Sequence, residues 1–169
     1  MIQRLNHAVL WVRDFDATVA FYRDVLGFRP IEGMPEMTGA CFLRADGSTN
    51  DHDLGLFAMP PGAGDTEAGR STVGLYHLAW EVDTLGTLND LAEKLTRAGA
   101  LVGATDHGTT KSLYAKDPSG IELELCWLIP ADRLTPEDRP KPNAPLDLAR
   151  EIARFGADTR GGVGISVPA

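Results

Sequence analysis

Two histidines occupy equivalent places in two similar segments of this 169-residue chain. His7 is the third residue of LNHAVLWV (Leu5–Val12), and His77 is the third residue of LYHLAWEV (Leu75–Val82). Imidazole is a common metal ligand, and two imidazoles with one carboxylate can hold a divalent ion with positions left open. A single strand histidine is more often packed or exposed, but the repeated placement favours a shared chemical role.

A carboxylate ligand is available in the last apolar segment, Ile121–Leu128. Side chains of a strand alternate between its two faces, so Glu122 and Glu124 lie opposite the apolar residues. The same alternation places His7 and His77 away from the faces that must pack on helices. The three strands are therefore expected to present two imidazoles and at least one carboxylate to one concave surface. Fe(II), Mn(II), Ni(II) and Zn(II) all accept such ligands.

The repeat extends to the elements that must position these residues. Each histidine strand precedes a helical pattern, Ala17–Leu26 ending at Gly27 and Leu88–Ala98 ending at Gly99. The segments that follow alternate between apolar runs and turn residues, and they predict strands near Pro30, Cys41–Ala45, Asp53–Met59, Leu101, Ser112–Lys116 and Ile121–Leu128. The prediction is an α+β fold of two paired βαβββ modules that form a cupped mixed sheet with helices on the outside.

The domain prediction follows from this repeat. Residues 1–130 are expected to form one domain, with module 1 at about 4–60 and module 2 at about 74–130. Residues 131–169 are expected to be a Pro-rich C-terminal extension with a short helix near Asp147–Phe155. Packing or a dimer contact is the role expected for this extension.

Composition excludes several classes of partner. The net charge of −8 and a pI near 4.9 argue against nucleic acid and anionic membranes. No apolar run reaches the roughly 18 residues of a membrane span, and the N-terminal segment does not read as a signal peptide. Cys41 and Cys126 are too few for a disulfide framework, so a cytoplasmic location is expected.

Three motifs resemble the vicinal oxygen chelate superfamily, over roughly residues 4–130. They are FYRDVLGF (Phe21–Phe28), YHLAWEV (Tyr76–Val82) and SLYAKDPSGIELEL (Ser112–Leu125). This superfamily includes glyoxalase I, fosfomycin and bleomycin resistance proteins, methylmalonyl-CoA epimerase and the type I extradiol ring-cleavage dioxygenases. The resemblance implies one metal ion inside a cupped sheet.

The metal ligands implied by the resemblance are His7, His77 and Glu124. The family's carboxylate lies seven residues after the Asp of an Asp-Pro-x-Gly turn, which is Asp117 here. Glu122 shares the same face and remains the alternative ligand.

The motifs are closest to those of the extradiol dioxygenases. His52, in His-Asp-Leu-Gly-Leu, resembles the acid/base histidine of that group, and imidazole titrates near neutral pH. His107 resembles a second histidine that contacts substrate oxygen, and Tyr114 matches a tyrosine that hydrogen-bonds the catecholate. Three departures are a longer segment between His52 and His77, Gly55 where Ala is commoner, and two modules where many members have four.

Glyoxalase I resembles this chain less well, because its second carboxylate ligand would fall at about Gly55 or Leu56. A site with three protein ligands leaves room for a chelating substrate and a second small molecule. Apolar candidates for the substrate walls are Trp11, Met34, Met37, Phe57 and Trp127, although strand alternation puts Trp127 on the back of the sheet.

The resemblance thus implies an Fe(II)-dependent extradiol dioxygenase that inserts O2 into a catechol-type aromatic, in a homodimer or larger homo-oligomer. The alternatives are a metal-dependent isomerase, epimerase or thiol transferase, and a drug-binding resistance protein without catalysis.

Overall fold

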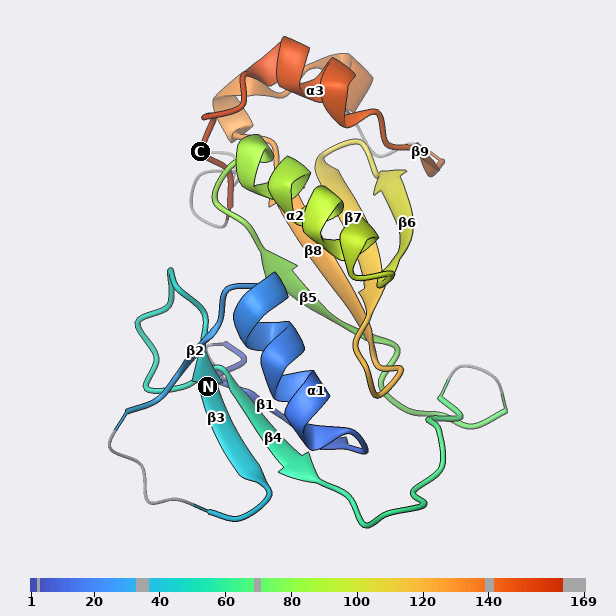
Figure 1. Cartoon of the computed structure of the whole chain (residues 1–169). Coiled ribbons are helices and arrows are strands. Elements are labelled where there is room, and N and C mark those ends of the chain that lie inside the picture. Colours follow the sequence, from blue (N-terminus) through green and yellow to red (C-terminus); the bar gives the residue numbers. More distant parts are fainter. Residues whose placement is uncertain (3, 33–36, 69–70, 139–141, 163–169) are drawn as a thin grey trace. The chain divides into compact units, whose positions relative to one another are not determined.

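The chain is described by a computed structural model over residues 1–2, 4–32, 37–68, 71–138 and 142–162. Its contacts divide it into two compact units, and Figure 1 gives the elements of each. Unit 1 consists of Met1–Thr66 and Asp117–Gly120, and unit 2 consists of Glu67–Lys116 and Ile121–Ala169. Met34, a predicted wall residue, lies outside the described residues.

Unit 1 has the element order of one βαβββ module. It contains β1 (Ala8–Val12), α1 (Phe15–Ala20), the π-helical turn η1 (Phe21–Val25), β2 (Arg29–Pro30), β3 (Ala40–Arg44) and β4 (Leu54–Ala58). The sheet order is β1-β4-β3-β2, with β1 parallel to β4 and the other pairs antiparallel. The parallel pair β1/β4 puts the strand that follows His7 next to the strand that follows His52.

The first helix begins earlier than the sequence pattern predicts. The side chain of Asp14 accepts a hydrogen bond from the backbone N–H of Ala17, and this cap starts the helix at Phe15. The helical segment continues through η1 and ends before Gly27, whose φ of 81° lies in the left-handed region. Tyr22 is fully buried on this segment and anchors it in the core of unit 1.

Unit 2 repeats the βαβββ order and adds the C-terminal extension. It contains β5 (His77–Glu81), α2 (Leu85–Arg97), β6 (Leu101–Asp106), β7 (Thr110–Lys116), β8 (Glu122–Leu128), η2 (Ala131–Arg133), η3 (Pro136–Asp138), β9 (Ala144–Pro145) and α3 (Leu148–Phe155). The order is β5-β8-β7-β6-β9, with β5 parallel to β8 and the other pairs antiparallel. Each module therefore has its own mixed sheet, as an α+β fold of paired modules requires.

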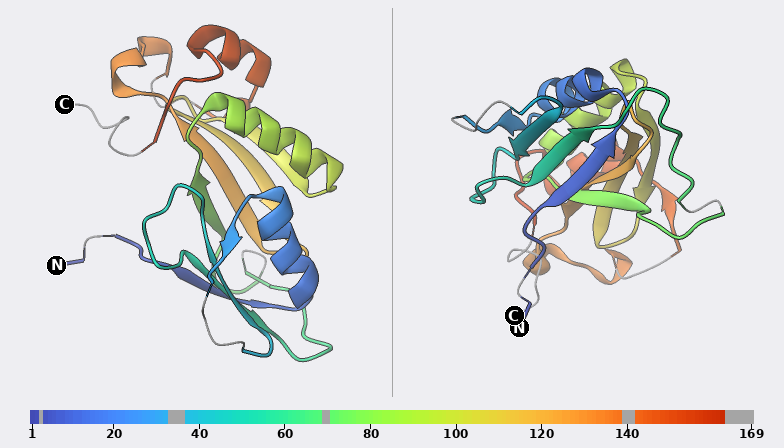
Figure 2. Two further views of the ribbon diagram at one scale, coloured as in Figure 1. Left: turned by 60° about the vertical axis from the view of Figure 1, so that its left-hand side comes forward. Right: turned by 90° about the horizontal axis from the view of Figure 1, so that it is seen from below.

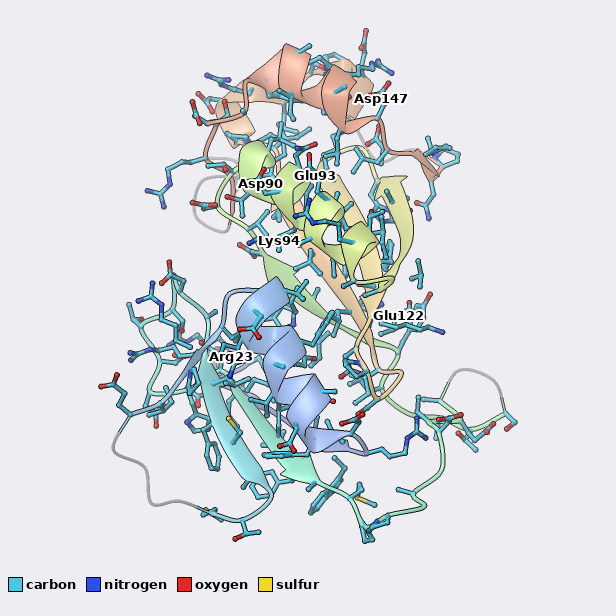
Figure 3. The ribbon with its side chains drawn as sticks, in the orientation of Figure 1. Arg23, Asp90, Glu93, Lys94, Glu122 and Asp147 are labelled. Atoms are coloured by element: carbon cyan, nitrogen blue, oxygen red, sulfur yellow. The ribbon has the colours of Figure 1, made fainter. Side chains whose placement is uncertain are left out.

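Helix α2 runs along one face of the sheet of unit 2 (Figure 2). Its four leucines at helical spacing are buried, namely Leu85, Leu88, Leu91 and Leu95. The charged side chains of Asp90, Glu93 and Lys94 are exposed on the same helix (Figure 3). The helix begins at Leu85 instead of Leu88 because Thr84 caps it by accepting from the N–H of Thr87.

The C-terminal extension is folded onto unit 2 in its described part. Strand β9 pairs with β6, and the buried Trp127 ring packs at a tilt against Phe155 of α3 with centroids 5.5 Å apart. The predicted short helix is thus present as α3. Among the described residues, no helix has the length and apolar character needed to cross a bilayer.

Candidate metal and substrate site

A histidine and a carboxylate meet across the parallel strands β5 and β8. His77 Nε2 lies 3.1 Å from Glu124 Oε2, and both side chains are largely shielded from solvent. Metal bonds of about 2.1 Å at right angles separate adjacent ligand atoms by about 3 Å. The pair therefore has the spacing of two neighbouring ligands in one coordination sphere.

The second oxygen of Glu124 is held from behind by a neighbouring strand. Ser112 Oγ donates a hydrogen bond of 2.5 Å to Glu124 Oε1, and Ser112 is fully buried on β7. This contact turns Oε2 toward His77. Glu122 is the register partner of His77, yet the carboxylate that meets the imidazole belongs to Glu124.

Tyr114 and His107 adjoin the pair in the same unit. Tyr114 is the register partner of Glu124, and its hydroxyl lies 2.9 Å from His107 Nε2. Burial, followed by the negative charge of Glu124, raises the pKa of Tyr114 to about 12. Tyr114 therefore keeps its proton throughout the physiological range and can donate a hydrogen bond to an anionic oxygen.

His7 and His52 come together in unit 1, at the start of the parallel pair β1/β4. Their ring centroids are 4.5 Å apart, and the Nδ1 of His7 lies 2.8 Å from Asn6 Oδ1. A hydrogen bond from Nδ1–H to Asn6 leaves Nε2 of His7 free to bind a metal. His52 Nδ1 lies 3.4 Å from Asp51 Oδ2.

An aromatic cluster continues from His52 along the sheet of unit 1. Phe42 lies edge-on to both His52 and Phe57, with centroid distances of 5.3 and 5.8 Å. Trp11, which is two-thirds exposed, lies edge-on to Phe57 at 5.6 Å. A Cβ at Gly55 would lie 3.4 Å from the nearest atoms of Phe42 and Val9, which is an ordinary packing contact.

The predicted site residues thus form two groups. His7 and His52 lie in unit 1, and unit 2 brings together His77, Glu124, Tyr114 and His107. Within the described residues of either unit, no three His, Cys, Asp or Glu side chains surround a common metal position. Of the wall residues, Trp11 and Phe57 join the aromatic cluster, whereas Trp127 is buried against α3.

Two functional candidates were missed by sequence reasoning. Ser112 shares the strand face of Tyr114 by simple alternation, which is a signal that could have found it. Phe42 carries no motif, and its role is visible only through its ring contacts with His52 and Phe57.

Comparison with known proteins agrees with this architecture. A family model described as the Glyoxalase/Bleomycin resistance protein/Dioxygenase superfamily matches residues 4–125. The crystal structure of a glyoxylase/bleomycin resistance protein/dioxygenase domain from Frankia sp. EAN1pec superposes with a TM-score of 0.61 at 24% identity. That match covers 75% of this chain and 92% of the Frankia chain, and it supports the fold alone.

Two curated relatives are dioxygenases by name. "Biphenyl-2,3-diol 1,2-dioxygenase 3" of Rhodococcus globerulus is 40% identical over 123 residues, covering 72% of this chain and 62% of that protein. "Iron-dependent extradiol dioxygenase" of Rhodococcus jostii is 32% identical over 137 residues, covering 73% of this chain and 42% of that protein. The chain therefore spans less than two thirds of the length of either relative.

The family model covers well over half of the chain, and the repeated βαβββ order agrees with it. These findings confirm the resemblance first seen in the three motifs. The chain belongs to the glyoxalase/bleomycin resistance protein/dioxygenase superfamily.

Proposed function

We propose that this protein is an Fe(II)-dependent extradiol dioxygenase that cleaves a catechol-type aromatic next to its two hydroxyl groups. The observation that carries the proposal is the His77–Glu124 pair at 3.1 Å, with the protonated Tyr114 beside it. The names of the two Rhodococcus relatives support the same class of reaction.

The proposed metal ligands are His7, His77 and Glu124. The two in unit 2 have ligand spacing, and the contact of His7 Nδ1 with Asn6 leaves its Nε2 for the metal. Held by these residues, Fe(II) would supply positive charge that lowers the pKa of the catechol hydroxyls, and a set of three protein ligands would leave room for catechol and dioxygen. Mn(II), Ni(II) and Zn(II) are alternative occupants of the same ligands.

Tyr114 and His107 are proposed to hydrogen-bond the substrate oxygens. The raised pKa of Tyr114 keeps it a donor, which suits a deprotonated catechol oxygen. His107 Nε2 lies 2.9 Å from the Tyr114 hydroxyl, so both groups can form hydrogen bonds with the same side of the substrate.

His52 is proposed to move protons during ring opening. Its imidazole is mostly buried between the His7 ring and Phe42, which fixes the orientation of the ring. An imidazole exchanges protons readily near neutral pH, as acid/base catalysis requires.

The aromatic cluster of unit 1 supports an aromatic substrate. The rings of Phe42, Phe57 and Trp11 form a continuous edge-to-face series that begins beside His52. Aromatic side chains of this kind can bind an apolar ring that a substrate carries in addition to its catechol ring, through stacking and burial. 2,3-Dihydroxybiphenyl is therefore the first substrate to test, and the name of the Rhodococcus globerulus relative favours the same compound.

The proposal extends to the domain organisation, the oligomeric state and the location of the protein. One domain over residues 1–130, with modules at about 4–60 and 74–130, would carry the activity, and residues 131–169 would pack on it or form a dimer contact. A homodimer or larger homo-oligomer and a cytoplasmic location are proposed as well.

The deciding experiment is an oxygen-electrode assay of protein loaded anaerobically with Fe(II). The expected result is oxygen uptake with a yellow product from 2,3-dihydroxybiphenyl or another catechol. No uptake across a broad catechol panel contradicts the proposal. Activity with Ni, Co, Zn or Mn in the absence of oxygen would favour an isomerase, epimerase or thiol transferase. Failure to bind any divalent metal would favour a drug-binding protein.

A further inference from the structure

The C-terminal extension reaches His107 through one side chain. Asn143 Oδ1 lies 2.8 Å from His107 Nδ1, on the side of the ring opposite to the Tyr114 contact. The imidazole is thus held at both nitrogens, by the extension at Nδ1 and by β7 at Nε2. An amide oxygen can only accept a hydrogen bond, so this contact requires the proton of His107 to be on Nδ1.

The pairing of β9 with β6 brings about this contact. Asp106, the last residue of β6, is the register partner of Ala144, the first residue of β9, in an antiparallel pair. The residue that follows β6 therefore faces the residue that precedes β9. Those residues are His107 and Asn143. Directly opposed residues of antiparallel strands have side chains close enough to interact, which explains why Asn143 meets the imidazole.

Buried charges fix the extension to the loop that carries His107. Lys111 Nζ lies 2.6 Å from Asp106 Oδ1 and 3.2 Å from Glu151 Oε2 of α3, and Lys111 is fully buried. The same Asp106 oxygen accepts a hydrogen bond from the N–H of Gly108. His107 therefore lies between Asp106, which is held by Lys111, and Gly108, which is held by Asp106.

We propose that Asn143 is a positioning residue that sets the tautomer of His107. With the proton on Nδ1, Nε2 of His107 presents its lone pair to the Tyr114 hydroxyl and to any substrate hydroxyl that takes its place. Asn143 thereby makes His107 a hydrogen-bond acceptor toward the substrate. The catalytic consequence rests on the proposed function, whereas the tautomer itself does not.

The tautomer is measured by 15N NMR of the full chain without metal, at a pH where the imidazoles are neutral. His107 is assigned among the four histidines by comparison with His107→Gln. We expect His107 of the wild-type protein to carry its proton on Nδ1. In Asn143→Leu we expect a mixture of the two His107 tautomers or a predominance of the Nε2–H form. Asn143→Asp keeps an acceptor and the Nδ1–H form, and Asn89→Leu on α2 is the control for the substitution itself.

The kinetic arm uses the iron-loaded protein with 2,3-dihydroxybiphenyl, normalised to bound iron. A hydrogen bond made to the bound substrate and kept in the transition state affects KM, so Asn143→Leu is expected to raise KM about five-fold with kcat within about two-fold. A purely structural role would instead lower the active fraction and leave KM unchanged. Asn143→Asp is expected to restore a KM near that of the wild type.

Two results overturn the inference: a wild-type His107 with its proton on Nε2, or an Asn143→Leu variant with unchanged tautomer and unchanged KM. If the iron-loaded protein cleaves no catechol, the proposed function fails while the NMR measurement still decides the role of Asn143.

Discussion

Glu124 Oε2 lies 3.1 Å from His77 Nε2, although Glu122 is the residue paired in register with His77. The ligand spacing of this contact and the burial of both side chains make it the centre of the candidate site. Glu122, which lies on the same strand as Glu124, provides a matched control for substitutions of the carboxylate.

Glu124→Gln is expected to abolish retention of iron, because it replaces a carboxylate ligand by a weakly coordinating amide. Glu122→Gln is the matched control and should retain iron at the wild-type level. The measurement is metal content after gel filtration, with circular dichroism to verify folding. Loss of iron from Glu122→Gln together with retention by Glu124→Gln would reverse the assignment.

Ser112→Ala is expected to weaken iron affinity about ten-fold, because residues that orient ligands typically contribute 10–100-fold. The variant loses the hydrogen bond to Glu124 Oε1 and frees the carboxylate to rotate. Competition with a chelator measures the affinity. An affinity within about two-fold of wild type would show that the serine does not orient the ligand.

His52→Gln is expected to lower kcat about 100-fold with unchanged iron content, because acid/base groups contribute roughly 10²–10⁴-fold. The glutamine keeps polarity at a mostly buried position beside Phe42. Oxygen uptake normalised to iron is the measurement. A kcat close to that of wild type would remove His52 from the chemistry.

Lys111→Met is expected to destabilise the protein by about 3–5 kcal/mol, because it removes the buried cation that Asp106 and Glu151 share, although Glu151 keeps its contact with Arg154. Lys94→Met on the exposed face of α2 should change the free energy of unfolding by less than about 0.5 kcal/mol. Urea denaturation measures both. Equal changes in the free energy of unfolding for the two substitutions would contradict a stabilising role of the Lys111 ion pairs.

The lowered pKa of Asp138 is expected to make the free energy of unfolding depend on pH. Burial opposes ionisation, but hydrogen bonds from Thr135 and Arg154 hold the pKa of Asp138 below its usual value. A lowered pKa in the folded state adds stability above the unfolded value of about 3.8, and this stability is lost as the pH falls toward the folded pKa. Asp138→Asn should therefore show a smaller fall in unfolding free energy between about pH 4 and pH 2. Urea denaturation at several pH values measures both proteins. An equal fall in unfolding free energy for the wild type and Asp138→Asn would contradict this role of Asp138.

Most of the architecture could be predicted from the repeat. The helix ends at the left-handed Gly27 and Gly99 and the alternation of the strands reflect local backbone preferences that the sequence carries directly, whereas His7, expected inside a strand, lies one residue before β1. The helix starts were misjudged because the caps Asp14 and Thr84 act before the apolar pattern begins.

The supporting contacts of the site were harder to predict. Ser112 meets Glu124 through β7–β8 register, and Asn143 meets His107 through a strand of only two residues, Ala144–Pro145. Both contacts depend on pairing between distant segments, which a local pattern does not encode.

Anomalous diffraction at the iron absorption edge, from crystals of the iron-loaded protein, tests the proposed ligand set. We expect one strong peak bonded to Nε2 of His7, Nε2 of His77 and an oxygen of Glu124, each at about 2.0–2.2 Å. A peak at another place, or one that lacks any of these three ligands, would contradict that ligand set.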